Sequence, residues 1–140
     1  MVVIDSDLII KYLRKKPKYA VEYLNELFDK EERLKTTIFN YAELLEGAYL
    51  TNNVPKNLRY IKDFLAKFEI LSFQLVDANL FSQIHAQLLK SGNPVGDMDV
   101  LIASIVLNQG ETLITRNTKH FSKIPLLKIK DWSQNSSLSS

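Results

Sequence analysis

The chain has 140 residues, of which 46% are hydrophobic and 24% charged, so it has the composition of one soluble globular domain with its own core. It contains no cysteine, which excludes a disulfide framework and a thiolate metal site. No apolar run is long enough to span a bilayer, and the N-terminus enters an apolar strand without the basic segment of a signal peptide. We therefore expect a cytoplasmic protein with no membrane partner.

Strand and helix patterns alternate along the sequence. Residues 2–4 are β-branched and apolar without alternation, which favours a strand covered on both faces. The helix-starting residues Asp5 and Ser6 follow, and apolar residues then recur at helical spacing until Pro17 breaks the pattern. Further helices are predicted at residues 18–31, 40–50, 55–68, 76–90 and 97–109, with a short turn at 119–121, and further strands at 34–38, 69–73, 112–115 and 126–129. This alternation predicts a parallel α/β sheet in a single domain, residues 1–132, followed by a polar tail, 133–140, that we expect to be disordered.

Acidic residues follow strands, or open the helices that come after them, at Asp5, Glu43, Asp97 and Asp99. Taken singly, each fits a helix cap. Asp5 and Asp97 have the residue type of N-caps, and Asp99 is a first-turn acid. Glu43 lies three residues after Asn40, which is the spacing of a capping box.

Taken together, the same acids predict a cation site. If the strands are parallel, the carboxylates converge on the sheet edge where open α/β folds bind ligands. Packed carboxylates repel one another, and a divalent cation removes that repulsion. An all-oxygen site suits Mg²⁺ or Mn²⁺, which can activate a water molecule for attack on a phosphate.

The basic residues give a weaker signal. The formal net charge of +2 does not by itself indicate a nucleic-acid partner. The basic residues form two groups, Lys11, Arg14, Lys15, Lys16 and Lys18, and then Arg116, Lys119 and Lys123. Either group fits a solvated helix face or a set of phosphate contacts. The two histidines, His85 and His120, are expected to lie outside the catalytic set.

Four segments resemble a known family. They are residues 3–7, with the first Asp, residues 40–47, with the Glu, residues 96–104, with the third acid, and residues 113–121, followed by Ile124 and Trp132. In this order and spacing they resemble PIN-domain ribonucleases, and among these the VapC-type toxins of toxin–antitoxin pairs. The resemblance implies a three-layer α/β/α fold with a five-stranded parallel sheet in the order 3-2-1-4-5.

The resemblance also implies roles for the site residues. The acids Asp5, Glu43 and Asp99 would be the catalytic core and would hold one or two Mg²⁺ or Mn²⁺ ions. Asp97 would be an auxiliary metal ligand or only the helix cap. Supporting roles would fall to Ser6, Thr115 and Asn117. Many family members carry a fourth acid where this chain has Asn117, which leaves the number of metal ions open.

The implied substrate is RNA, cleaved by a metal-activated water. The backbone phosphates would be held by Arg116, Lys11 and Arg14, without sequence choice. The resemblance further implies a homodimer and a small antitoxin that inserts side chains near the site. That groove could be lined by Tyr41, Leu45, Tyr49 and Tyr60, which fit ordinary core or surface positions equally well.

Two alternatives remain, one of them another enzyme and the other a non-catalytic protein. A haloacid-dehalogenase-like phosphatase also carries Asp-x-Asp after its first strand, here Asp5 and Asp7, with the first Asp as covalent nucleophile. That alternative leaves Glu43 without a role. The second alternative is a non-catalytic acidic-pocket module, either a receiver domain or a PIN-like fold that only binds RNA or a partner. A receiver domain needs an acceptor Asp at the end of a middle strand, and the predicted strand 69–73 offers none. A degenerate PIN fold should have lost core acids, whereas this chain keeps three.

Overall fold

The structure, a computed structural model, describes residues 1–30 and 33–133. Its strands are β1 (Val2–Ile4), β2 (Leu34–Thr37), β3 (Phe68–Leu71), β4 (Thr112–Ile114) and β5 (Lys128–Lys130). Its helices are α1 (Ser6–Arg14), α2 (Lys18–Lys30), α3 (Ile38–Tyr49), α4 (Val54–Leu65), α5 (Leu75–Lys90), α6 (Asp97–Gln109) and α7 (Thr118–Phe121). All strand pairs are parallel and their order is β3-β2-β1-β4-β5, which confirms the predicted sheet.

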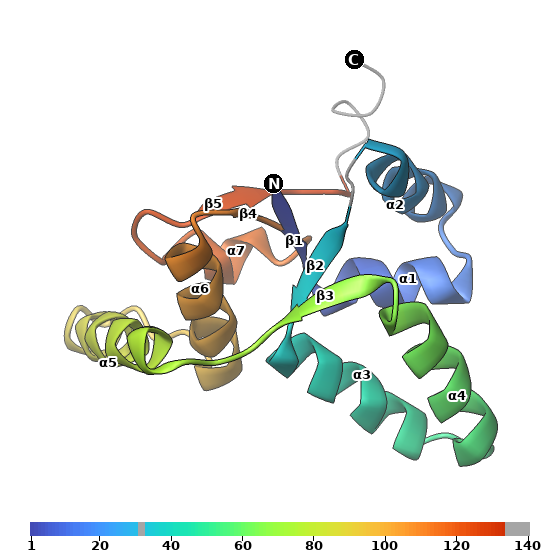
Figure 1. The fold of residues 1–140 in the computed structure, drawn as a ribbon. Helices are drawn as coiled ribbons and strands as arrows, with labels where there is room; N and C mark the ends of the chain where they lie inside the picture. The colour runs from blue at the N-terminus through green and yellow to red at the C-terminus, as the bar shows by residue number, and fades with distance from the viewer. Residues whose placement is uncertain (31–32, 134–140) are drawn as a thin grey trace.

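The sheet is covered on both faces, because neighbouring residues of a strand point to opposite sides. Ile4 of β1 and Ile114 of β4 pack in one apolar cluster with residues of α1 to α4. Val3 and Leu113, one position earlier in the same strands, pack in a second cluster with α5, α6 and α7. Figure 1 shows the two groups of helices on opposite sides of the sheet. The strands are apolar without alternation because both faces of the sheet are buried, as the sequence predicted.

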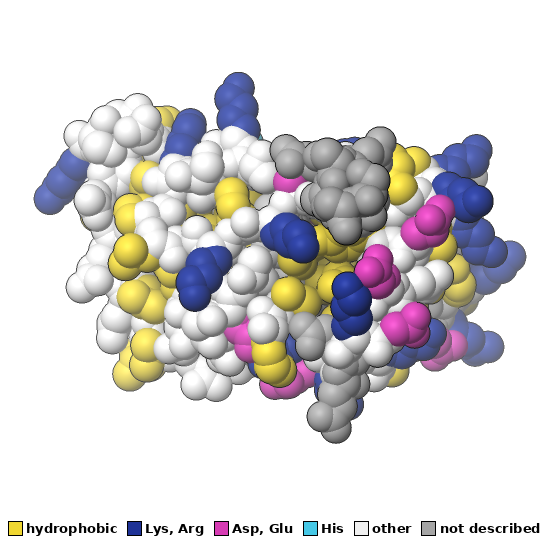
Figure 2. Space-filling view, turned by 90° about the horizontal axis from the view of Figure 1, so that it is seen from above, with side chains coloured by type: hydrophobic (Ala, Val, Ile, Leu, Met, Phe, Trp, Pro, Cys, Tyr) yellow, Lys and Arg dark blue, Asp and Glu magenta, His cyan; other side chains and the backbone are white. Residues whose placement is uncertain are grey.

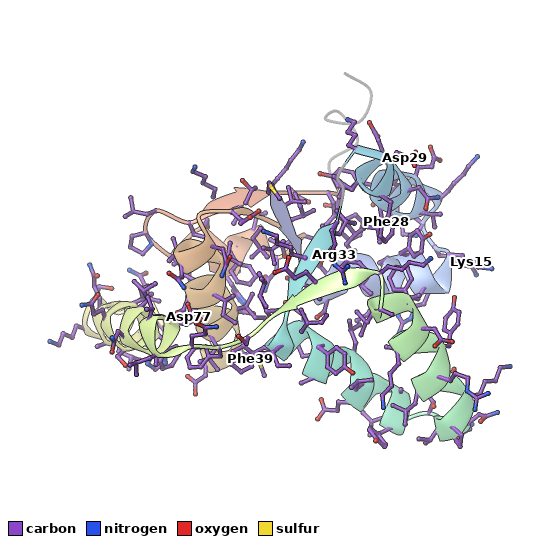
Figure 3. The ribbon with its side chains drawn as sticks, viewed as in Figure 1. Lys15, Phe28, Asp29, Arg33, Phe39 and Asp77 are labelled. Carbon is purple, nitrogen blue, oxygen red and sulfur yellow. The ribbon has the colours of Figure 1, made fainter. Side chains whose placement is uncertain are left out.

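An aromatic cluster joins α2 and α4 to the edge strand β3. Phe28 of α2 lies with its ring centroid 6.0 Å from that of Phe64 and 5.6 Å from that of Phe68. Figure 3 shows Phe28 in this position, with Arg33 nearby, whose Nη2 donates to the Phe68 carbonyl at 3.2 Å. The prediction that Phe68 belongs to the preceding helix is wrong, because α4 ends at Leu65 and Phe68 opens the strand.

The start of α3 and the start of the last strand also differ from the prediction. Helix α3 starts at Ile38, and its N-cap is Thr37, whose hydroxyl accepts from the Asn40 backbone N–H. The capping box therefore pairs Thr37 with Asn40, and the predicted pairing of Asn40 with Glu43 is wrong. The last strand begins two residues later than predicted, because Leu126 has a φ of 67°, which lies outside the extended backbone region that strands need.

The surface charge and the apolar content of the helices are those that the composition predicts. Figure 2 looks onto the end of the molecule where the N-terminus lies, and Lys and Arg side chains are spread over this face without forming one patch. No helix in the described ranges is long and apolar enough to cross a membrane. The predicted polar tail falls, apart from Ser133, on residues 134–140, outside the described residues.

Candidate active site

Asp5 lies at the carboxyl end of the central strand, where three segments hold its side chain. It is the N-cap of α1, and its Oδ1 accepts from the Ser6 backbone N–H at 2.9 Å and from Asn40 Nδ2 at 2.8 Å. Its Oδ2 accepts from the hydroxyl of Thr115, the residue after β4, at 2.7 Å. Only 8% of Asp5 is exposed. Asp5 is therefore a helix cap, as its residue type predicts, and also the centre of a buried polar network.

The position of Asp5 makes its negative charge unfavourable. Burial raises the pKa of Asp5 from 3.8 to about 7, and the neighbouring charge of Asp7 adds to the rise. Hydrogen bonds from Thr115, Ser6 and Asn40 stabilise the ionised form but do not offset the burial. A buried carboxylate with so raised a pKa is a functional-site candidate, since a bound cation would restore the ionised form.

Glu43 joins this network through Ser6. The Ser6 hydroxyl donates to Glu43 Oε1 at 3.1 Å and accepts from Asn40 Nδ2 at 2.9 Å. Burial raises the pKa of Glu43, the hydrogen bond from Ser6 opposes the rise, and the charge of Asp99 adds to it. Glu43 on α3 therefore lies within the electrostatic reach of Asp99 on α6, as the convergence of the acids requires.

Asn40 is a site residue that the sequence interpretation assigned only to a helix cap. Its side chain is fully buried. Its amide nitrogen donates to both Asp5 and Ser6, and its Oδ1 accepts from the Thr37 hydroxyl at 2.7 Å. The available signal was the residue type: an amide in the first turn after a strand brings two donors to an edge that otherwise collects acceptors.

Asp7 is the second residue whose role the sequence did not reveal. Its Oδ2 accepts from the Arg116 backbone N–H at 2.8 Å and lies 3.2 Å from the Thr115 hydroxyl oxygen. Its Oδ1 accepts from Trp132 Nε1 at 2.9 Å. Asp7 thus ties the first helix to the segment after β4 and to the end of the domain, and both of its carboxylate oxygens are engaged.

The two acids of α6 have different surroundings. The N-cap of the helix is Gly96, so Asp97 and Asp99 both belong to the first turn. The exposed Asp97 has its Oδ1 2.8 Å from His85 Nε2 on α5. Asp99 is only 24% exposed at the side chain, and its Oδ2 lies 3.3 Å from His120 Nδ1. Asp99 therefore faces the segment after β4, whereas Asp97 is paired with α5.

The predicted supporting residues connect these parts. The Asn117 backbone N–H donates to Thr115 Oγ1 at 3.0 Å, and its side-chain Nδ2 lies 3.4 Å from Asp99 Oδ2. A continuous path of polar contacts thus runs from Asp99 through Asn117 and Thr115 to Asp5. His120, which the sequence interpretation placed outside the catalytic set, lies beside Asp99 in this path.

The donor groups fit a hard divalent cation by their chemistry. Asp5, Glu43 and Asp99 offer carboxylate oxygens, and the pKa values of the first two are raised mainly by burial and further by neighbouring carboxylates. Across residues 1–30 and 33–133, no three Asp, Glu, His or Cys side chains are already grouped so that they could hold one ion. The metal role of these acids, and of Asp97, stays a prediction.

The basic residues predicted to bind RNA differ in their relation to the acids. Arg116 follows Thr115, and its guanidinium lies 5.3 Å from the centre of the Trp132 ring. Arg14 and Glu43 line the same cavity of about 260 Å³. Of the four residues predicted to line a groove for the antitoxin, Tyr60 lines this cavity. Lys11 is half-buried near the end of α1, and its contact with RNA stays a prediction.

Sequence comparisons match this chain to a protein family and to several relatives with names. A model of the PIN domain family matches residues 2–127. The chain is 29% identical to the tRNA(fMet)-specific endonuclease VapC of Salmonella typhimurium, over 93% of this chain and 96% of the relative. It is also 29% identical to ribonuclease VapC1 of Haemophilus influenzae (strain R2866), over 94% of this chain and 98% of the relative.

Solved structures give the same result for the fold. VapBC2 from Rickettsia felis, bound to a DNA fragment from its promoter, contains a chain that superposes with a TM-score of 0.85 at 26% identity, covering 95% of this chain and 100% of that one. VapBC-1 from nontypeable Haemophilus influenzae contains one with a TM-score of 0.84 at 29% identity, covering 96% and 100%.

Proposed function

Because the chain belongs to the PIN domain family, we propose that it is a Mg²⁺- or Mn²⁺-dependent endoribonuclease that acts as the toxin of a toxin–antitoxin pair. Relatives that match over nearly their whole length are named as ribonucleases. The observation that carries the proposal is Asp5, a buried carboxylate with a pKa raised to about 7, joined by polar contacts to Glu43 and Asp99.

Each residue has a defined part in this proposal. Asp5, Glu43 and Asp99 would hold the ion. When bound, such an ion supplies an activated water and stabilises negative charge on the phosphoryl oxygens. Asn40 and Thr115 fix the two oxygens of Asp5, so that the carboxylate is oriented before any ion or substrate arrives.

The RNA backbone would be held by cations around the acids. Arg116 is positioned at its backbone by Asp7 and at its guanidinium by the ring of Trp132. Arg14 stands beside Glu43 at the cavity between α1, α3 and α4, and Lys11 lies one turn earlier on α1. Contacts of this kind bind phosphates without reading bases, so we expect binding to weaken steeply with salt.

A protein partner is part of the same proposal. The solved relatives are named as VapBC assemblies, in which the VapC-like chain is accompanied by a second protein. The cavity with Glu43 and Tyr60 on its wall is a suitable place for an antitoxin segment to reach the acids. The homodimer remains a prediction of the family resemblance.

The phosphatase alternative is disfavoured by the surroundings of Asp7. That mechanism needs the second acid of the Asp-x-Asp motif beside the reacting phosphate. Here both oxygens of Asp7 accept hydrogen bonds, from Trp132 on one side and from the Arg116 backbone on the other. Asp7 is therefore a structural anchor.

The test is Mg²⁺-dependent cleavage of RNA by purified protein. We expect Asp5→Asn to reduce the cleavage rate by roughly 100-fold or more, since one group that stabilises transition-state charge contributes that much. The matched control is Asp29→Asn, which makes the same chemical change at an exposed position near the end of α2 (Figure 3). Equal cleavage by the wild type and by Asp5→Asn would refute the proposal.

A further inference from the structure

Three adjoining cavities lie beside α1 and α4. The first, of about 260 Å³, has Glu43 and Arg14 on its walls. The second, of about 550 Å³, is lined by residues of α1, α2 and α4, and the third, of about 670 Å³, lies along α4. Tyr60 lines all three and Leu13 lines the first two, so one groove, here called the Tyr60 groove, leads away from Glu43 past Tyr60.

The surface around the Tyr60 groove is strongly basic. Residues 14–18 and 54–67 carry eight of the 18 Lys and Arg residues of the chain and only one of its 16 Asp and Glu residues. All eight are exposed. Figure 1 shows the connection between α1 and α2 on the same side of the molecule as α4. The rest of the chain is therefore net negative, and this corner is where the molecule attracts a polyanion.

Each of the three cavities has at least one of these cations on its wall. From the first cavity to the third they are Arg14, then Lys15, Lys18 and Lys67, then Lys56 and Arg59. The Lys67 ammonium lies 5.5 Å from the centre of the Phe64 ring, which holds this charge at the wall of the second cavity. A ligand that carries a negative charge at every repeat, as a nucleic-acid backbone does, matches cations distributed along a groove.

The groove also offers an aromatic ring on which a base can stack. Tyr60 is 50% exposed, so part of its ring is open to a ligand. Tyr12 and Phe64 stack on each other with ring centroids 5.1 Å apart and form an apolar wall of the second cavity. Exposed rings among cations are the features by which proteins hold single-stranded nucleic acid, because its bases are unpaired.

We propose that the Tyr60 groove is a non-catalytic binding site for single-stranded RNA, in which a base stacks on Tyr60 and neighbouring phosphates contact Lys15, Lys18 and Lys67. The inference rests on the proposed function, because this RNA is the strand that continues from the bond to be cleaved. Lys15 follows Ser6 by nine residues at the end of α1, which is about 13 Å at about 1.5 Å per residue. The strand therefore continues for up to about four stacked nucleotides beyond the acids, at about 3.4 Å each.

The test measures the binding of a labelled single-stranded RNA of mixed sequence, about ten nucleotides long, which is a usual length for a single-strand site. Binding is measured in the Asp5→Asn background with a chelator present, so that no RNA is cleaved. The variants are Tyr60→Leu, which removes the ring, and a triple Lys→Gln change at the three lysines of the second cavity. The matched controls are Tyr60→Phe, which keeps a ring, and Lys90→Gln at the exposed end of α5, with circular dichroism as the check on folding.

We expect Tyr60→Leu to raise the Kd for RNA roughly tenfold, because a base loses its stacking partner, and Tyr60→Phe to leave it within about twofold. The triple lysine variant should reduce the slope of log Kd against log salt concentration by about 2, since each phosphate contact with a single strand contributes about 0.7. Lys90→Gln should leave the slope as it is. In the protein that keeps Asp5, Tyr60→Leu should raise KM roughly tenfold and leave kcat within about twofold, because the groove holds RNA equally before and during cleavage.

The possible outcomes separate this site from the nuclease. RNA binding that is absent, or that is equal in the parent protein, in Tyr60→Leu and in the triple lysine variant, would overturn the site even if the protein cleaves RNA. If Tyr60→Leu abolished the binding of an acidic amphipathic peptide and left RNA binding unchanged, the groove would belong to a protein partner and the RNA site would also be overturned. RNA binding that depends on Tyr60 in a protein that never cleaves RNA would overturn the proposed function and leave the site standing.

Discussion

Replacing Asp5 by Asn should stabilise the metal-free protein at neutral and alkaline pH. The folded-state pKa of about 7 lies above the ordinary value of 3.8, because burial and the charge of Asp7 disfavour the ionised form. The folded protein therefore binds the proton more tightly than the unfolded chain does. Stability falls as pH rises from 3.8 to about 7, and the loss is complete above that range.

The size of the effect follows from the two pKa values. The difference between 3.8 and about 7 corresponds to about 4 kcal/mol of folding free energy, at about 1.36 kcal/mol per pKa unit. Between pH 5.5 and pH 8, the wild type should lose about 2 kcal/mol through this one group. An Asn resembles the protonated carboxyl in shape, so the variant should lack this loss, while imperfect hydrogen bonding to Asn40 and Thr115 reduces its advantage below the full value.

The measurement is urea unfolding of the wild type and Asp5→Asn at several pH values from 5.5 to 8, with a chelator present. Subtracting the two free energies at each pH removes the contribution of every other titrating group. The difference should grow by about 2 kcal/mol in favour of the variant as pH rises. A difference that does not change with pH would show that Asp5 is not the buried group with the raised pKa.

Two further variants test the network itself. Asn40→Ala removes the buried amide that donates to Asp5 and Ser6, and we expect it to lower the free energy of unfolding in urea by about 2–4 kcal/mol. The control, Asn53→Ala at the exposed N-cap of α4, should lower it by about 1 kcal/mol or less. An equal loss at both positions would contradict the role of Asn40. Asp7→Ala should change the fluorescence of Trp132, the single tryptophan of the chain, because its indole N–H loses its acceptor, and it should move the pH-dependent loss of stability to lower pH, because the charge of Asp7 raises the pKa of Asp5. An unchanged emission spectrum would argue against that hydrogen bond.

The fold was largely predictable because its signals are local. The β-branched run at residues 2–4 is covered on both faces, as apolar runs without alternation indicate, and Gly110 ends α6 with a φ of 67°. The errors also have local causes. Thr37 caps α3 but is itself a β-branched residue at the end of a strand, so the pattern does not say where the strand ends and the helix begins. Phe68 continues the apolar spacing of α4 yet pairs in β3.

Part of the site could be predicted from the sequence. The residues that were missed, Asn40 and His120, are of types that usually have structural roles. Acids after parallel strands point to one sheet edge, so Asp5 could be singled out from topology alone. Nothing in the sequence says that Asn40 is fully buried or that His120 lies beside Asp99, because both facts depend on how α3 and α7 pack. Asp97 and Asp99 are two residues apart on one helix, yet Asp97 contacts His85 of α5 and Asp99 contacts Asn117. This difference also depends on the neighbouring elements.

The hydrogen bonds to Asp5 and its burial have opposite effects on its pKa. Donors on Asn40, Thr115 and Ser6 lower the pKa of Asp5, yet it stays near 7 because burial outweighs them. If the network existed only to stabilise the fold, an uncharged residue would serve it better, since a buried carboxylate without a cationic partner destabilises the protein. The network therefore fixes the direction of the two carboxylate oxygens and leaves their charge uncompensated. A bound cation would complete that arrangement, and this is the physical reason for proposing these acids as a metal site.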